Sequence, residues 1–246
     1  IRNSLYGRSI HLLRLSTMIR VTHYQRKTGL GMYSLERLFS DIRAVMPSDI
    51  TVEVQGCAFT SKGLWRRVYN MVEAVFRQGD VNHITGDVHF LTYLLKRKRT
   101  VLTINDCVSL ELSSGFKRWM LWLLWYWLPM HRVSAVTVIS EATKQELLKF
   151  VNYDPDKIIV IHCCVSDFFR ADERPFNSSC PRVLQVGTSE HNKNVERVAE
   201  ALAGINCKWV IIGRLSLAQL AIIKRYGIDY ENHVGLSEED LLVQYK

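Results

Sequence analysis

The sequence predicts an α/β protein in which helices cover mostly parallel sheets. Along its 246 residues, short runs rich in β-branched residues alternate with segments whose apolar residues recur at helical spacing. Most of these short runs are apolar throughout, which is typical of strands buried on both faces of a parallel sheet. Hydrophobic residues make up 48% of the chain, enough to fill the cores of such a fold.

The strand patterns lie at residues 19–23, 51–54, 101–104, 135–139, 158–161, 183–186 and 209–212, with a further short run at 83–85. The helical patterns lie at residues 35–46, 64–77, 117–128, 141–150, 195–203 and 217–226. Pro47 ends the first helix and Ser140 is placed to cap the fourth. Gly204 and Gly227 close the last two helices. The order of these elements favours a doubly wound sheet.

A polar stretch at residues 166–180 predicts a domain boundary. We expect residues 18–170 to form an N-terminal domain and residues 175–246 a second one, for which only two clear strands are expected. Ser237 and Asp240 form a capping box close to the end of the sequence, so a helix starts there. We therefore expect the chain to stop before its second domain is complete. Because the chain begins with Ile1 and not Met, we expect residues 1–17 to be a non-native or disordered extension.

The net charge of +8 and the pI of about 9.2 favour polyanionic partners, either phosphate-bearing ligands or anionic surfaces. Nucleic acid is the least supported partner, because the densest basic run, residues 96–99, has no interleaved aromatic residues and no nucleic-acid-binding module is recognisable. The six cysteines have neither CxxC pairs nor metal-ligand spacing, which indicates a reducing compartment. The first residues lack the pattern of a signal peptide, and we expect a cytoplasmic protein.

The most apolar stretch, residues 119–128, is about ten residues long and falls short of the roughly 20 that span a bilayer. It carries four tryptophans with basic residues on both sides, which is compatible with a helix lying in a membrane interface. A buried core or interdomain helix is the alternative.

In open α/β sheets, ligands bind beyond the carboxyl ends of the strands. Glycine, small hydroxyl, amide and carboxylate residues follow the strands of this chain. They are Gly29 and Gly31, Asp87, Asn105 and Asp106, Ser140 and Glu141, Gly187 and Thr188, and Gly213 and Arg214. We expect these residues to converge on one cleft.

Two of the glycine turns open helices and have the features of phosphate sites. Gly29 and Gly31 allow the backbone to approach a phosphate at the positive end of a helix, although a tight strand-to-helix turn has the same pattern. The second turn, Gly187, leads to Lys193 at the start of another helix. A lysine there adds a mobile positive charge to the backbone N–H donors, and a solvated helix N-terminus is the alternative.

Seven segments carry a family resemblance. They are TGLGMYSLERL (28–38), HITGDVHFLTYLL (83–95), VLTIND (101–106), VTVISEATKQELLKF (136–150), VIHCCVSDFF (160–169), VGTSEHNKNVERVAEAL (186–202) and VIIGRLS (210–216). In this order they resemble the blocks of retaining GT-B glycosyltransferases of family four. The Ser-Glu block and the Gly-Thr to Lys-Asn block are the most specific of them.

The resemblance implies two Rossmann-like domains with parallel sheets, the second incomplete. It also implies transfer of a sugar from a nucleoside-diphosphate sugar to an acceptor hydroxyl with retention, without a metal or another cofactor. The acceptor is expected to be a glycan or a lipid-linked molecule in polysaccharide or glycolipid assembly, with peripheral contact to the inner face of a membrane. The implied site residues are Asn105 and Asp106 as catalytic groups, Gly29, Gly31, Gly187, Thr188, Lys193 and Asn194 on the donor side, and Asp87, Ser140 and Glu141 on the acceptor side.

Three positions depart from the family pattern. Asn105 replaces a histidine that contacts the reacting sugar, and an asparagine cannot act as a charged acid. The segment His162-Cys163-Cys164 replaces Pro-Asn-Gly or Pro-Asn-Pro, and the glutamate pair that binds the donor falls beyond Lys246. We therefore expect the chain as it stands to be inactive. A non-catalytic relative that binds sugar nucleotides is the alternative.

Overall fold

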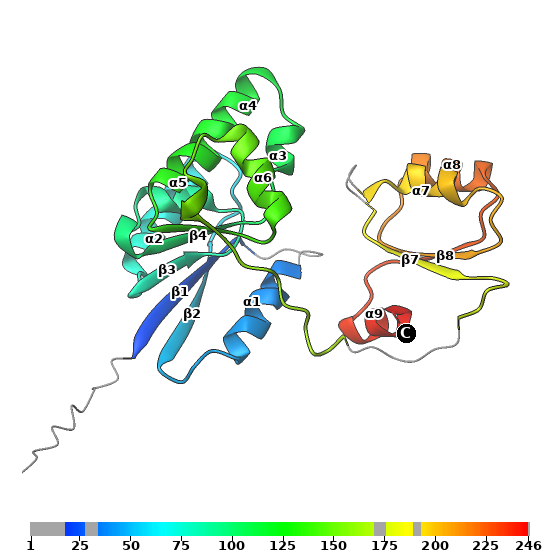
Figure 1. Ribbon diagram of the computed structural model, residues 1–246, viewed down its shortest axis with the longest axis horizontal. Coiled ribbons are helices and arrows are strands. Elements are labelled where there is room, and N and C mark those ends of the chain that lie inside the picture. Colours follow the sequence, from blue (N-terminus) through cyan, green and yellow to red (C-terminus); the bar gives the residue numbers. More distant parts are fainter. Residues whose placement is uncertain (1–17, 28–33, 170–175, 189–192, 246) are drawn as a thin grey trace, which may run out of the picture. The chain divides into compact units, whose positions relative to one another are not determined.

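The computed structural model describes residues 18–27, 34–169, 176–188 and 193–245. It divides into two compact units, residues 1–166 and 167–246. Figure 1 shows the elements of each unit. The extension expected at residues 1–17 and the turn containing Gly29 and Gly31 lie outside the described residues.

The first unit is built on a six-stranded sheet with the strand order β2-β1-β3-β4-β5-β6. Its strands are β1 (Ile19–Gln25), β2 (Ile50–Gly56), β3 (Val81–Ile84), β4 (Thr100–Ile104), β5 (Ala135–Val138) and β6 (Ile158–Val160). Each neighbouring pair is parallel. The chain winds to one side of β1 and then to the other, so the strand order switches between β1 and β3. In doubly wound sheets, ligands bind at such a switch point.

Helices cover both faces of this sheet. The longer ones are α1 (Ser34–Ala44), α2 (Leu64–Phe76), α4 (Gly115–Leu121) and α6 (Glu141–Phe150), and the shorter ones are η1 (His89–Tyr93), η2 (Arg97–Arg99), α3 (Val108–Glu111), η3 (Trp122–Trp127), α5 (Leu128–His131) and η4 (Pro155–Lys157). The Tyr24 hydroxyl donates to the carbonyl of Ala74 in α2, while the neighbouring His23 packs edge-on against Phe39 in α1. Since adjacent strand residues point to opposite faces, α1 and α2 lie on opposite sides of the sheet.

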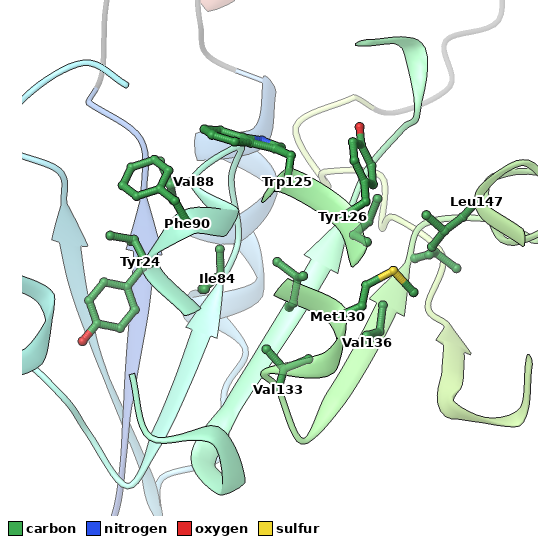
Figure 2. Packing of buried hydrophobic residues seen from close by; sticks show 14 of the residues in the cluster. Tyr24, Ile84, Val88, Phe90, Trp125, Tyr126, Met130, Val133, Val136 and Leu147 are labelled. Atoms are coloured by element: carbon green, nitrogen blue, oxygen red, sulfur yellow. The ribbon is translucent and has the colours of Figure 1, made fainter. Parts of the chain in front are cut away.

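The face covered by α2 carries the apolar core. Ile84, Leu102 and Ile104 are completely buried there and belong to one cluster with residues of the helical region after α4. Figure 2 shows Met130 and Val136 close together within this cluster, with Leu147 of α6 beside them. Burial of such side chains contributes roughly 1.5–3 kcal/mol each, so this face supplies most of the unit's stability.

The opposite face, beneath α1, carries a polar row that crosses four strands. The rings of His23 and His83 meet edge-on with their centroids 5.2 Å apart. His83 Nε2 lies 2.7 Å from Thr103 Oγ1, which lies 2.7 Å from Thr137 Oγ1. Burial lowers the pKa of His23 to about 4 and that of His83 to about 3. Both imidazoles are therefore neutral near pH 7.

The helix expected at residues 117–128 is longer and winds differently. It begins at Gly115, widens into the π-helical segment η3 and continues through Pro129 to His131, so the expected end at residue 128 was wrong. In η3 the Leu128 N–H donates to Leu123, five residues back, and Pro129 has no N–H to donate. The carbonyls that this leaves free are those of Leu124 and Trp125. Both accept hydrogen bonds from η1, because the Tyr93 hydroxyl donates to Leu124 and His89 Nδ1 donates to Trp125 at 2.6 Å.

The tryptophan-rich stretch at residues 119–128 is partly buried in the core and partly exposed. Trp125 and Tyr126 are buried in the core cluster, whereas Trp119 is 49% exposed and stacks with the exposed Phe116. Among the described residues, no helix has the length and apolar character needed to cross a membrane. All six cysteines are free thiols.

The second unit contains a three-stranded parallel sheet with the order β7-β8-β9. Its elements are β7 (Arg182–Val186), α7 (Val195–Leu202), β8 (Lys208–Ile212), α8 (Leu217–Arg225), β9 (Tyr230–His233) and α9 (Glu238–Tyr245). Trp209 and Ile211 are fully buried against α7 and α8. The sequence-based count of two strands was wrong, because β9 lies at the sheet edge and its residues, Tyr-Glu-Asn-His, lack an apolar pattern.

The neutral histidines predict acid sensitivity of the first unit. Below about pH 6.5 both histidines bind a proton in the unfolded chain, whereas His23 and His83 of the folded chain stay neutral. The free energy of unfolding therefore falls as the pH drops toward about 4, by up to about 1.4 kcal/mol per pH unit for each histidine. His83→Gln should flatten this dependence. Urea unfolding followed by tryptophan fluorescence at about pH 7 and about pH 5 measures it. An identical loss of stability in the unchanged protein and in His83→Gln would contradict a neutral, buried His83.

Candidate active site in the first unit and glycine turns in the second

A cleft of about 720 Å³ lies at the carboxyl ends of the first sheet's strands. Its wall is formed by residues that follow β1, β2, β3 and β4 and by residues of α2, α4 and η3. Arg26, after β1, and Asp87, after β3, flank the point where the strand order switches. The cleft is therefore at the place where the topology predicts a ligand.

Positive charge dominates the cleft, because five basic side chains and one carboxylate line it. Arg26 forms an ion pair with Glu36 at 3.1 Å, and Lys27 donates to the carbonyl of Ala58. In the described part of the chain, the side chains of Lys62 and Lys117 have neither an ion pair nor a hydrogen bond. Charges that lack a protein partner in a concave site attract anionic ligands.

Trp125 holds the charged groups of the cleft in place. Its indole N–H donates to Asp87 Oδ1, and the Arg67 guanidinium lies 4.8 Å from the indole ring centre. Arg67 Nε also donates to the carbonyl of Ser61 at 2.8 Å, which fixes the side chain. The exposed Asp87 is thus oriented at the cleft wall, and its place on the acceptor side stays a prediction.

Asn105 lies in a different cavity. It lines a space of about 230 Å³ between α1 and the polar face of the sheet, together with His23, His83 and Cys163. Asn105 Oδ1 and His23 Nδ1 are buried without a hydrogen-bond partner among the described residues. A buried unpaired polar atom costs about 1–3 kcal/mol, so a bound molecule that donates to Asn105 would recover that energy.

Asp106, Ser140 and Glu141 are engaged in local structure. Asp106 Oδ1 accepts from the backbone N–H of Val108 at the start of α3. Ser140 caps α6 by accepting from the Thr143 N–H at 3.1 Å, as predicted, and Glu141 accepts from Gln145 one turn later. These contacts place all three side chains beside the ends of β4 and β5. Their assigned roles in the reaction stay predictions.

In the second unit, the two glycine turns pack against each other. Thr188 Oγ1 donates to the carbonyl of Arg214 at 2.6 Å, and Gln219 donates to the carbonyl of Thr188. Gly213 has φ +137°, and a Cβ there would lie 2.6 Å from Thr188 Oγ1. The Thr188 hydroxyl therefore joins the turns after β7 and β8 into one structure.

Lys193 crosses the first of these turns. Gly187 has φ +92°, which favours glycine, and a Cβ there would lie 3.0 Å from Lys193 Cε, so the lysine side chain passes close to the turn. Asn194 has a left-handed conformation with φ 53° and starts α7. The exposed Lys193 ammonium thus lies on a flexible stem close to the N-terminus of α7, where an anion is favoured.

The predicted residues of the first unit are distributed over two cavities and not gathered in one cleft, with Asp87 in the basic cleft and Asn105 beneath α1. Sequence reasoning missed Lys62, Arg67 and Lys117. Their signal was weak, since basic residues at the start of a helix are usual on a solvated surface. Within the described ranges, no group of three or more His, Cys, Asp or Glu side chains could hold a metal ion. The metal-independent reaction stays a prediction.

Comparison with known proteins places the fold and part of the first unit. The family Glycosyltransferase Family 4 matches residues 56–167, which include Asp87, Asn105, Asp106, Ser140 and Glu141. HepE from Anabaena, in complex with UDP and glucose, has a TM-score of 0.61 at 12% identity over 89% of this chain and 70% of that protein. The chain has a GT-B fold. No curated protein sequence matches it.

A similar fold occurs in an enzyme of another kind. UDP-GlcNAc 2-epimerase from Neisseria meningitidis, bound to UDP-GlcNAc, has a TM-score of 0.53 at 12% identity over 92% of this chain and 74% of that protein. At these identities the structural likeness establishes the fold of the chain. The family match covers residues 56–167, less than half of the chain.

Gly213→Ala should destabilise the second unit by about 2–4 kcal/mol, because it adds an unfavourable φ to a collision with Thr188. Gly235→Ala is the matched control, since Gly235 also has a positive φ but no atom within 4 Å of an added Cβ. It should cost only about 1 kcal/mol. Thermal unfolding of the three proteins measures the difference, and equal losses for the two variants would refute the close packing of the turns.

Proposed function

We propose that this protein is a glycosyltransferase that uses a nucleoside-diphosphate sugar as its donor. The observation that carries the proposal is the match of residues 56–167 to Glycosyltransferase Family 4, because this segment holds most of the cleft wall at the carboxyl ends of the strands. Solved proteins with a similar fold bind UDP, UDP-glucose or UDP-GlcNAc. A UDP-sugar is therefore the first donor to test.

In this proposal the donor diphosphate binds at Lys193 and the turns of the second unit. An acceptor hydroxyl attacks the anomeric carbon, the bond from that carbon to the diphosphate oxygen breaks, and the hydroxyl proton leaves with the diphosphate or to solvent. Negative charge grows on the leaving diphosphate, and an ammonium group beside helical N–H donors stabilises it. Retention and independence from metal ions are proposed on the family resemblance alone.

On the acceptor side, the basic cleft of the first unit is proposed to hold the acceptor. Asp87 is an exposed carboxylate fixed by Trp125, so it can accept a hydrogen bond from a sugar or acceptor hydroxyl. Asn105 is proposed to bond the transferred sugar through its unpaired Oδ1. Neither group needs to change its charge for these roles.

The test is to incubate the protein with a panel of UDP-sugars and to measure binding, release of UDP and the fate of the sugar. Sugar transferred to an added acceptor supports the proposal. Conversion of UDP-GlcNAc into its 2-epimer would refute it in favour of an epimerase. Tight binding without any turnover would instead support the non-catalytic relative.

Lys193→Ala should weaken binding of the UDP-sugar by roughly 1.5–3 kcal/mol, because it removes a charge-assisted hydrogen bond to the diphosphate. Calorimetric titration measures the affinity. Lys224→Ala is the control, since Lys224 is an exposed lysine in the last turn of α8, away from the glycine turns. Unchanged affinity in Lys193→Ala would remove the lysine from the donor site.

In a form of the protein that also carries the family's donor-binding glutamate pair, Asn105→His should raise the rate of sugar transfer about tenfold or more, because an imidazole can donate a hydrogen bond and share a proton near the reacting sugar. In the chain as it stands, the same substitution should restore no transfer. Asn105→Ala should lower the rate, since the partner of the sugar hydroxyl is lost. Initial rates at saturating UDP-sugar distinguish the three proteins. A slower Asn105→His protein that binds the donor normally would show that the amide itself is required.

A further inference from the structure

The basic cleft carries more positive charge than a neutral acceptor needs. Lys62 enters it before α2 and Lys117 from α4, and neither has an ion pair in the described part of the chain. Arg67 lines the same wall, with its Nε already bonded to Ser61. Three basic side chains from separate segments thus line one cavity, an arrangement suited to a phosphate group.

A second wall of the same cleft is apolar. Met120, Leu121 and Leu124 line it from α4 and η3, each partly exposed. A sugar or an inorganic anion leaves such a surface in contact with water, whereas an alkyl or isoprenoid chain covers it. The cleft therefore fits a ligand that joins a phosphate to an apolar chain.

The surface next to the cleft continues this pattern. Leu64 and Trp65 follow Lys62 and are 71% and 82% exposed, while Phe116 precedes Lys117 and is 75% exposed. The exposed side chains of Arg66 and Arg118 accompany them. Exposed aromatic residues among basic ones are typical of a surface that lies in the headgroup region of an anionic membrane. We call Trp65, Phe116 and Trp119, together with the neighbouring Leu64, the aromatic rim.

We propose that the basic cleft binds the phosphate group of a membrane-borne amphiphile, whose apolar chain passes over Met120, Leu121 and Leu124 to the aromatic rim. In the proposed function this amphiphile is the sugar acceptor, so the inference rests on that function. The phosphate is a recognition group. The oxygen that receives the sugar is a hydroxyl elsewhere on the acceptor, and no bond to phosphorus changes.

Calorimetric titration of the whole chain with farnesyl phosphate, farnesol and inorganic phosphate tests the cleft. Farnesyl phosphate should bind at least about tenfold more tightly than either of the others, because only it uses both walls. The double variant Lys62→Ala/Lys117→Ala should weaken this binding by about tenfold or more. Lys98→Ala/Arg99→Ala, which removes the same charge from η2 outside the cleft, should leave it unchanged.

Three results would overturn the proposal. Farnesyl phosphate that binds no better than farnesol would show that the phosphate is not recognised. Equal effects of the two double variants would show that only the net charge matters. Competition by UDP for the farnesyl phosphate site would assign the cleft to the donor. Circular dichroism of each variant confirms that these exposed substitutions leave the fold intact.

Vesicles test whether the amphiphile is taken from a membrane. The protein should co-sediment with phosphatidylcholine vesicles that contain farnesyl phosphate, and Trp65→Ser/Phe116→Ser should reduce this by about tenfold or more. Phe76→Ser is the control, because Phe76 is 81% exposed at the other end of α2. Equal sedimentation of the rim variant and the control would refute docking through the rim.

The glycosyltransferase function and the lipid phosphate site can be refuted independently of each other. If the protein binds and turns over a UDP-sugar but farnesyl phosphate does not bind, the acceptor assignment is wrong and the glycosyltransferase stands. If farnesyl phosphate binds as described but no UDP-sugar binds, the cleft is a lipid phosphate site and the proposed function fails.

Discussion

Parallel pairing of every strand is the constraint on which both units depend. A parallel pair needs a long crossover, so each strand is followed by a helix or a long connection that returns over the sheet. The carboxyl ends of all strands in a sheet then share one edge, and the residues after them become neighbours. Asp87 and Lys62 line one cleft in this way, and Thr188 bonds to Arg214, although the chain separates the members of each pair.

The two faces of the first sheet differ in character. The face under α2 is apolar and closely packed, whereas the face under α1 holds neutral histidines, hydroxyl groups and the unpaired Asn105 oxygen beside a cavity. Polar groups can be buried there because His83, Thr103 and Thr137 satisfy one another across neighbouring strands. A polar face with a cavity is thus carried by a sheet that is stabilised from its other side.

Local signals made much of the fold predictable. The Ser140 cap and the apolar strands were readable because each depends on residues close together in the sequence. The polar edge strand β9 and the widened turn at η3 were not, since one has no apolar pattern and the other depends on His89 and Tyr93, more than thirty residues earlier. The basic cleft was missed for the same reason, because α2 and α4 bring its charges together only in three dimensions.

The π-helical segment η3 also limits how this region can vary. Its wider winding holds one residue more than an α-helix would over the same path, and Met130, just beyond it, is completely buried. Deleting a single residue between Trp122 and Trp127 would restore ordinary winding and leave the residues after it at the same positions around the axis, so Met130 would stay in the core. Deleting a second residue would turn everything after it by about 100° and take Met130 out of the core. This helix can therefore lose one residue at η3 but not two.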